Sequence, residues 1–135
     1  AYVMQVLHDI DTPEQMAAAE AAFRWAQGLP SGKTFVFDID GVIASIVLGN
    51  DYALAKPLIG NIARLRRLHA RGNKIVLFTA RGYVTRIDWS ETTRRQMQEW
   101  GVPHHELHYG KPAADFYIDD KMLSLADLAA LDSVP

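Results

Sequence analysis

Residues 33–45 read KTFVFDIDGVIAS, an apolar run that leads directly into two aspartates one residue apart, a glycine and further apolar residues. The apolar and partly β-branched character of residues 34–39 predicts a buried strand. Carboxylates at the end of such a strand are costly unless a partner or a bound ion compensates their charge. Asp38 and Asp40 are therefore the first candidates for a functional site.

The composition of the whole chain is that of an ordinary globular protein. The chain has 135 residues, 49% of them hydrophobic and 22% charged, which suits one compact domain and is not typical of a disordered protein. The net charge of −2 gives no electrostatic case for a nucleic-acid partner, and the lack of cysteine excludes disulfides and a thiol nucleophile. No apolar run is long enough for a membrane span and no signal pattern is visible, so we expect a cytoplasmic protein without a membrane partner.

From residue 33 onward, predicted strands alternate with predicted helices. Strands are expected at 34–39, 74–79, 106–109 and 115–119. Helices are expected at 57–71 and at 124–131, the latter capped by Ser124. A further helix begins with a capping box of Asp88 and Glu91 and ends at Gly101. Strands separated by helices predict a parallel sheet with right-handed crossovers. The expected fold is α/β, a Rossmann-like parallel sheet flanked by helices.

The first part of the chain has a different pattern, a short strand followed by a helix. Thr12 is a good N-cap, Pro13 suits the first helical position, and Gln15 completes a capping box. The segment LPSG (29–32) has the composition of a linker. We therefore expect an extension over residues 1–32 and a main domain over residues 33–135.

Polar and charged residues follow each predicted strand of the main domain. They are Asp38 and Asp40 after the first strand, Thr79 and Arg81 at the second, Lys111 after the third, and Asp119 and Asp120 at the fourth. Ligands of open α/β sheets bind beyond the carboxyl ends of the strands, so these residues are expected to converge. Four carboxylates require a cation, and an all-oxygen donor set favours Mg²⁺. Magnesium with two cationic side chains would hold a phosphate group, whose phosphorus a carboxylate could attack to give an aspartyl-phosphate.

Each part of this pattern also has an ordinary structural interpretation. Taken singly, the two aspartates can be a chance pair, Thr79 a strand residue, Lys111 a surface lysine, Asp120 a helix cap, and Arg81 the partner of Asp88. A calcium-binding loop is excluded, because the glycine of DIDG comes too early and an apolar strand precedes the acids. The order and position of all the elements together favour the functional interpretation.

Three histidines, His104, His105 and His108, precede Lys111. On a strand they would point to different faces, so an exposed turn and strand is favoured over a metal site.

The segments VFDIDGV, LFTAR, GKP and FYIDDK, in this order over residues 33–131, resemble the four motifs of the haloacid dehalogenase superfamily of phosphohydrolases. The resemblance implies that Asp38 is the nucleophile and that Asp40 is the general acid and base. It further implies that Thr79 donates a hydrogen bond to the transferring phosphoryl group and that Lys111 neutralises it. The superfamily pattern has threonine after the glycine in many members, where this chain has Val42.

The same resemblance implies a magnesium site. Asp38 and the backbone carbonyl of Asp40 would bind the ion, Asp119 would ligate it, and Asp120 would help directly or through water.

A narrower resemblance concerns the flanking residues. GNDYALAKPLIGNIARLRRL and GVPHHELHYGKP are similar to small phosphatases encoded with bacterial capsule-biosynthesis enzymes, which implies a phosphorylated sugar or polyol as substrate. The connection between Gly41 and Pro57 would be a flap, without room for a cap domain, so the site would be open or closed by a second subunit of a homo-oligomer. Lys56 and Arg81 are then candidate substrate ligands, although flap packing and solvated charge are equally compatible with the sequence, as they are for Tyr52.

The segment HDIDTPEQMAAAE near the N-terminus resembles the closing strand and helix of sugar nucleotidyltransferases. Because Asp9 and Asp11 alone cannot complete a nucleotide site, we favour for this chain a helix-capping strand end packed on the main domain. The resemblance also implies a longer parent protein of nucleotide-sugar synthesis, which would join a nucleotidyltransferase to a phosphatase.

Two other functions remain open from the sequence. A polynucleotide end phosphatase on the same scaffold is disfavoured by the near-neutral charge. A non-catalytic regulatory module is disfavoured because Asp38, Asp40 and Lys111 are all present.

Overall fold

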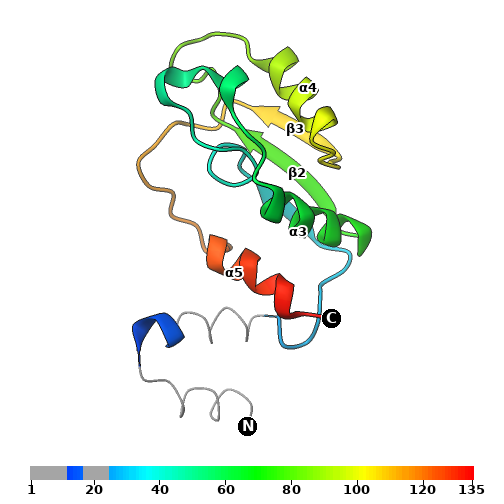
Figure 1. Ribbon diagram of the computed structural model, residues 1–135. Coiled ribbons are helices and arrows are strands. Elements are labelled where there is room, and N and C mark those ends of the chain that lie inside the picture. The colour runs from blue at the N-terminus through cyan, green and yellow to red at the C-terminus, as the bar shows by residue number, and fades with distance from the viewer. Residues whose placement is uncertain (1–11, 17–24) are drawn as a thin grey trace. The chain divides into compact units, whose positions relative to one another are not determined.

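A computed structural model describes residues 12–16 and 25–135 of the chain. Two compact units are distinguished: one consists of residues 1–29 and 119–135, and the other of residues 30–118. The division near residue 30 lies close to the boundary expected from the sequence at residue 32, but residues 119–135 are grouped with the N-terminal part. Figure 1 shows the elements of each unit.

The unit of residues 30–118 contains a parallel three-stranded sheet. Its strands are β1 (Thr34–Phe37), β2 (Lys74–Thr79) and β3 (Glu106–Tyr109), in the order β1-β2-β3. Helix α3 (Ile59–Ala70) connects β1 to β2, and helix α4 (Ser90–Glu99) connects β2 to β3 (Figure 1). The predicted α/β class with a parallel sheet flanked by helices is confirmed.

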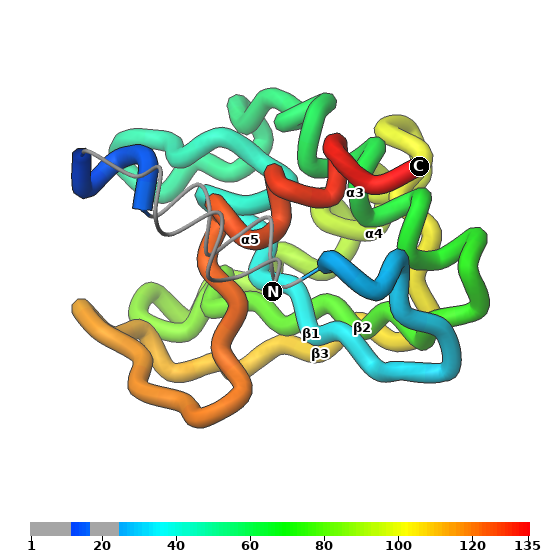
Figure 2. The backbone as a smooth tube through the Cα atoms, turned by 90° about the horizontal axis from the view of Figure 1, so that it is seen from below, coloured from blue at the N-terminus to red at the C-terminus, as the bar shows by residue number. Residues whose placement is uncertain are grey.

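Both helices cover the same face of the sheet (Figure 2). Successive crossovers that step along a sheet in one direction place their helices together, because each crossover has the same hand. The core between the layers consists of fully or almost fully buried apolar side chains, among them Ile62, Leu65 and Leu68 of α3, Ile75 and Leu77 of β2, and Met97 of α4. Burial of each such side chain is worth about 1.5–3 kcal/mol, so this core holds the strand ends in place.

The predicted capping box of α4 is wrong. The helix begins at Ser90 with Trp89 at the N-cap position, and no side chain caps it there. Asp88 lies one residue too early for the capping box, and its Oδ1 accepts a hydrogen bond from the backbone N–H of Ser90 at 2.9 Å. The carboxylate therefore closes a short turn before the helix.

The predicted strand at 115–119 is also absent from the structure of these residues. Residues 111–117 form a loop that closes on itself instead, because the Tyr117 hydroxyl donates to the carbonyl of Pro112 and the Lys111 ammonium lies 4.2 Å from the centre of the Tyr117 ring. Phe116 and Ile118, which a buried strand would cover, are exposed by 85% and 99%.

The connection between β1 and α3 forms a loop whose two ends are joined. Ser45 and Lys56 are paired, since the Ser45 N–H donates to the Lys56 carbonyl at 2.8 Å and the Lys56 N–H donates to Ser45 Oγ at 2.9 Å. An isolated antiparallel bridge links Ala44 to Pro57. Two 3₁₀ turns, η1 (Leu48–Asn50) and η2 (Tyr52–Leu54), lie within the loop. Residues 44–57, the predicted flap, are thus a closed surface loop without a folded domain in it.

In the other unit, both predicted helix caps are confirmed. Thr12 and Gln15 form a reciprocal capping box, and Ser124 caps α5 (Leu125–Ala129) together with Asp127. A 3₁₀ turn, η3 (Ala130–Ser133), follows α5, and the Trp25 indole N–H donates to the Asp127 carbonyl at 2.6 Å. The predicted N-terminal strand, with Asp9 and Asp11, lies outside the described residues. Among the residues that are described, no helix is both long and apolar enough to cross a bilayer.

Candidate active site

Asp38 and Lys111 form an ion pair just beyond the carboxyl ends of β1 and β3. Asp38 Oδ2 lies 3.0 Å from Lys111 Nζ, and Asp38 Oδ1 accepts a hydrogen bond from the next backbone N–H, that of Ile39, at 2.8 Å. The backbone N–H of Lys111 donates to the carbonyl of Thr79 at 3.1 Å. The sheet thus brings the predicted nucleophile, the predicted phosphate-neutralising lysine and the end of β2 to one edge.

The Asp38–Lys111 pair is partly accessible to solvent. The two side chains are 33% and 16% exposed, respectively. The Lys111 ammonium also lies over the Tyr117 ring, a cation–π contact that limits where the lysine can point. A carboxylate that a ligand can reach and that has a fixed cation beside it is suited to bind and attack a phosphoryl group.

A tight turn begins directly after Asp40. Gly41 has a φ of 89°, a left-handed conformation that glycine adopts readily and other residues rarely do. The turn is closed by the Gly41 N–H, which donates to the Ala44 carbonyl at 2.7 Å. The glycine of the DIDG segment therefore permits the turn that directly follows Asp40.

Asp40 is held by Arg81. The guanidinium makes two parallel hydrogen bonds to the carboxylate, from Nε to Oδ2 at 3.0 Å and from Nη2 to Oδ1 at 2.9 Å. The Arg81 side chain is fully buried, while that of Asp40 is 22% exposed. This bidentate geometry fixes the position of the carboxylate. The predicted alternative, an Arg81–Asp88 pair, is wrong.

The remaining Arg81 donors reach α4 and the flap. Nη1 donates to Thr93 Oγ1 at 3.1 Å and to Gln96 Oε1 at 2.6 Å. The guanidinium carbon lies 4.8 Å from the centre of the Tyr52 ring. Gln96 in turn donates from Nε2 to the Tyr52 carbonyl at 2.6 Å. The side chains of Asp40, Arg81, Thr93, Gln96 and Tyr52 therefore form one connected network, called the Arg81 network below.

Sequence reasoning did not find Thr93 and Gln96 as members of this network. A signal existed, because both are polar and stand three positions apart on the buried face of α4. Buried polar side chains in a helix need partners, and a buried arginine supplies donors for two of them. Burial also raises the pKa of the Tyr52 hydroxyl, and the negative charge of Asp40 adds to this effect while Arg81 opposes it.

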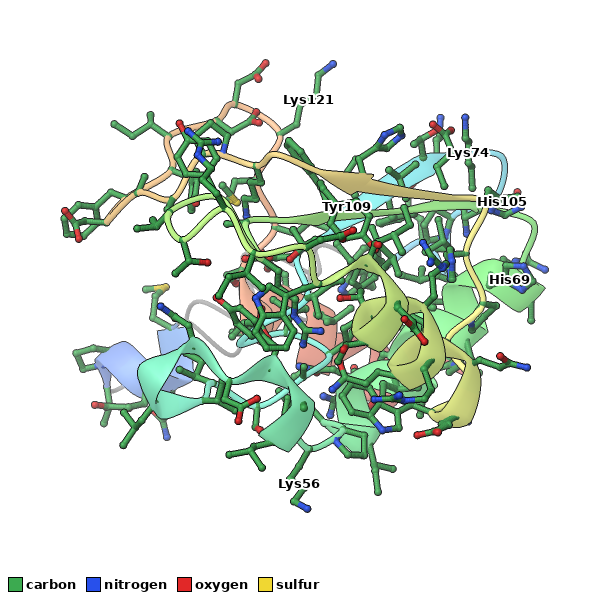
Figure 3. All side chains as sticks on the ribbon, turned by 90° about the horizontal axis from the view of Figure 1, so that it is seen from above. Lys56, His69, Lys74, His105, Tyr109 and Lys121 are labelled. Carbon is green, nitrogen blue, oxygen red and sulfur yellow. The ribbon has the colours of Figure 1, made fainter. Side chains whose placement is uncertain are left out.

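Three other predicted residues occupy distinct positions. Thr79 is fully buried at the end of β2, where its hydroxyl accepts a hydrogen bond from the Arg81 N–H at 3.1 Å. Lys56 is exposed at the base of the flap, and its side chain projects outward (Figure 3). The buried guanidinium of Arg81 donates its hydrogen bonds to other side chains of the protein. Substrate contacts by Thr79, Lys56 and Arg81 stay predictions.

Asp119 and Asp120 belong to the unit of residues 1–29 and 119–135 and are exposed. The pKa of Asp119 is lowered by hydrogen bonds from the Lys121 backbone N–H and from Asp120. Their role as magnesium ligands stays a prediction.

The available donors are chemically suited to a magnesium ion. Asp38 has one oxygen hydrogen-bonded to Ile39 and the other to Lys111, and each carboxylate oxygen keeps a further lone pair for a cation. Hard oxygen donors are those that Mg²⁺ prefers. Within the described part of the chain, no three His, Asp or Glu side chains are gathered as a metal site.

The three histidines do not converge. Ile75 N–H donates to His105 Nδ1 at 3.0 Å, whereas His108 Nε2 lies 2.8 Å from Glu106 Oε1. His104 Nδ1 contacts the Val102 carbonyl at 2.9 Å.

Comparison with known proteins gives one structural relative. The crystal structure of a structural-genomics target from Vibrio cholerae is similar to this chain, with a TM-score of 0.66 and 29% sequence identity over 72% of this chain and 87% of that one. No family model and no curated protein matches the sequence. The likeness agrees with an α/β fold that has a parallel sheet flanked by helices.

Proposed function

We propose that the chain is a Mg²⁺-dependent phosphatase of the haloacid dehalogenase type, without a cap domain. Its proposed substrate is the phosphomonoester of a sugar or polyol, hydrolysed through an aspartyl-phosphate. The observation that carries the proposal is the accessible Asp38 carboxylate with Lys111 Nζ at 3.0 Å, beside a second aspartate that has a separate partner.

The two aspartates divide the chemistry. Asp38 attacks phosphorus, so that a bond forms between its carboxylate oxygen and phosphorus while the bond to the leaving oxygen breaks. Asp40 gives that oxygen a proton, and the alcohol departs. Asp40 then takes a proton from water as the water attacks phosphorus, which releases phosphate and restores Asp38.

The other groups orient these steps. Lys111 compensates charge on the phosphoryl oxygens, and Thr79 supplies a hydroxyl donor at the end of β2. Arg81 keeps the Asp40 carboxylate aimed, since it holds both oxygens. A bound magnesium ion would add positive charge for the phosphoryl group, with Asp38 and the Asp40 carbonyl among its ligands.

Phosphate release from a panel of sugar and polyol monophosphates tests this function. We expect release that requires Mg²⁺ and stops in excess chelator. Release from no substrate, or full release in excess chelator, would contradict the proposal. A role in surface-polysaccharide or nucleotide-sugar synthesis follows only from the sequence resemblance and stays a prediction.

A further inference from the structure

A cavity of about 290 Å³ lies beside the strand ends, between the loop that follows β2 and the end of β3. Its lining includes the loop residues Tyr83, Arg86 and Trp89, and Tyr109 from β3. Tyr109 reaches from the end of β3 towards α4, where its hydroxyl donates to the Ser90 carbonyl at 3.4 Å (Figure 3). We call this the loop cavity and residues 81–89 the cavity loop.

The walls of the loop cavity are continuous in the chain with the candidate active site. One wall starts at Arg81, two residues after Thr79, and another ends at Gly110, directly before Lys111. Neighbouring Cα atoms are about 3.8 Å apart. A group that contacts Gly110 in the cavity would therefore lie close to the backbone of Lys111, the lysine that pairs with Asp38. The flap does not line this cavity.

The lining of the loop cavity combines aromatic rings with polar groups of both kinds. Three of the lining residues, Tyr83, Trp89 and Tyr109, are aromatic. The Arg86 guanidinium lies 5.4 Å from the centre of the Tyr83 ring, and Asp88 adds a carboxylate. Ligand sites are typically apolar and aromatic with a few polar groups that fix orientation. A hydroxylated ring matches this lining, because its apolar face can lie on an aromatic ring while its hydroxyls both donate and accept.

Three local features indicate that the cavity loop is held in a costly conformation. Arg86 has a φ of 63°, which residues other than glycine rarely adopt. The Trp89 indole N–H is buried and has no hydrogen-bond partner among the described residues. The loop is also tightly closed, since a Cβ on Gly82, whose φ is 80°, would lie 2.3 Å from the Ile87 carbonyl oxygen. Strained backbone and unpaired buried donors are concentrated at functional sites.

We propose that the loop cavity binds the monosaccharide ring of the substrate, and that the cavity loop selects which sugar phosphate is hydrolysed. The inference rests on the proposed phosphatase function for its phosphoryl end. The sequence placed the specificity of the site in the flap, with Lys56 and Arg81 as substrate ligands. The cavity places it instead in Tyr83, Arg86 and Tyr109.

The experiment compares a ring-bearing substrate with one that has no ring. For the wild type, Tyr83→Ala and Arg86→Ala, kcat/KM is measured on hexose and pentose monophosphates and on acetyl phosphate. Loss of one well-placed contact is worth roughly tenfold or more, so each variant should lower the ratio of sugar-phosphate to acetyl-phosphate kcat/KM by about tenfold, mainly through KM. Tyr83→Phe, which keeps the ring, should recover most of this ratio. Arg95→Ala, which removes the same charge from an exposed position on α4, should leave the ratio unchanged.

A binding measurement separates the two proposals. Calorimetry with Asp38→Asn, with and without Tyr83→Ala, measures affinity for the same monophosphates when turnover is blocked. If binding depends on Tyr83 but the wild type releases no phosphate, the result would support the cavity as a binding site and contradict the proposed phosphatase function. If the wild type turns over sugar phosphates but neither variant changes the ratio of sugar-phosphate to acetyl-phosphate kcat/KM, the proposed role of the cavity is wrong and the proposed phosphatase function stands.

Discussion

Asp38 and Asp40 are one residue apart in the sequence but have different partners. Asp38 contacts Lys111, which follows β3, whereas Asp40 is bound by Arg81, which follows β2. One carboxylate is therefore accessible to a phosphoryl group, and the other is fixed by a buried guanidinium. Different environments for two nearby acids are what a division into nucleophile and proton carrier requires.

The proton-transfer role of Asp40 predicts a dependence on the leaving group. Asp40→Asn keeps an isosteric side chain but removes general acid and base catalysis, which contributes roughly 10²–10⁴-fold. We expect this loss on a sugar phosphate and a much smaller loss on an activated aryl phosphate, whose leaving group needs little protonation. Steady-state kinetics on both substrates measure it. Equal losses on both would show that Asp40 has another role.

At the residue scale, the sequence could predict which residues lie at the carboxyl ends of the strands, but not how each side chain is used. The order of motifs and the parallel topology were sufficient to bring Asp38, Thr79 and Lys111 to one sheet edge. The direction of Arg81 was not predictable, because its position after Thr79 is compatible with either an inward or an outward side chain. Only the packed positions of Thr93 and Gln96 favour the inward one.

At the scale of elements, the Arg81 network joins β2, α4 and the flap. Removal of one partner of a buried ion pair costs about 3–5 kcal/mol, because the other charge is left uncompensated. Arg81→Met should therefore lower the free energy of unfolding by an amount in this range, measured by urea denaturation. The double variant Arg81→Met with Asp40→Asn should recover part of the loss.

The matched control for this prediction is Arg95→Met on the exposed face of α4, where the nearest carboxylate, on Glu99, lies 4.0 Å away. Its effect should be small, as for other surface ion pairs. A cost for Arg81→Met that is no larger than that of Arg95→Met would contradict the buried-pair interpretation.

The link between β2 and β3 predicts a dependence of stability on pH. Hydrogen bonds from Lys74 and His108 lower the pKa of Glu106 from 4.5 to about 2. A carboxyl whose pKa is lower in the folded protein than in the unfolded chain stabilises the fold. This contribution is complete above the pKa of the unfolded chain and is lost as the pH falls towards the pKa of the folded protein. Above pH 4.5, Glu106→Gln should therefore be less stable than the wild type. This difference in the free energy of unfolding should become smaller as the pH falls from 4.5 to 2.

Chemical denaturation of both proteins across this pH range measures the difference. Glu99→Gln is the control, since its carboxylate is exposed and its pair with Arg95 is long. A stability difference between wild type and Glu106→Gln that stays constant with pH would show that the Lys74–Glu106–His108 contacts do not hold in solution.

Elements with strong local signals were predicted well, and those that depend on a partner were not. The helix expected at 57–71 is α3, and the strand expected at 74–79 is β2, because periodic burial and β-branched residues determine them locally. The short apolar run within residues 115–119 also predicted a strand. A strand also needs a neighbouring edge, and here Tyr117 contacts Lys111 and Pro112 instead.

At the scale of the whole molecule, the proposed chemistry requires a divalent ion that the chain binds only when folded. A ligand that binds the folded state alone stabilises it by about 2.7 kcal/mol at a concentration of 100 times its Kd. Saturating Mg²⁺ should therefore raise the midpoint of thermal unfolding, and Asp38→Asn should reduce this shift. Differential scanning calorimetry with Mg²⁺ and with excess chelator measures both, and Glu99→Gln should keep the full shift. An equal shift in Asp38→Asn and wild type would exclude Asp38 as a ligand.

The most direct test of the central claim is a search for the phosphorylated enzyme. The protein is mixed with Mg²⁺ and an activated aryl phosphate, quenched during turnover, digested and analysed by mass spectrometry. We predict a phosphoryl group on Asp38 in the wild type, more of it in Asp40→Asn because its hydrolysis is slowed, and none in Asp38→Asn, which should also release no phosphate. Turnover by Asp38→Asn at a rate near that of the wild type, or phosphorylation at a residue other than Asp38, would contradict it.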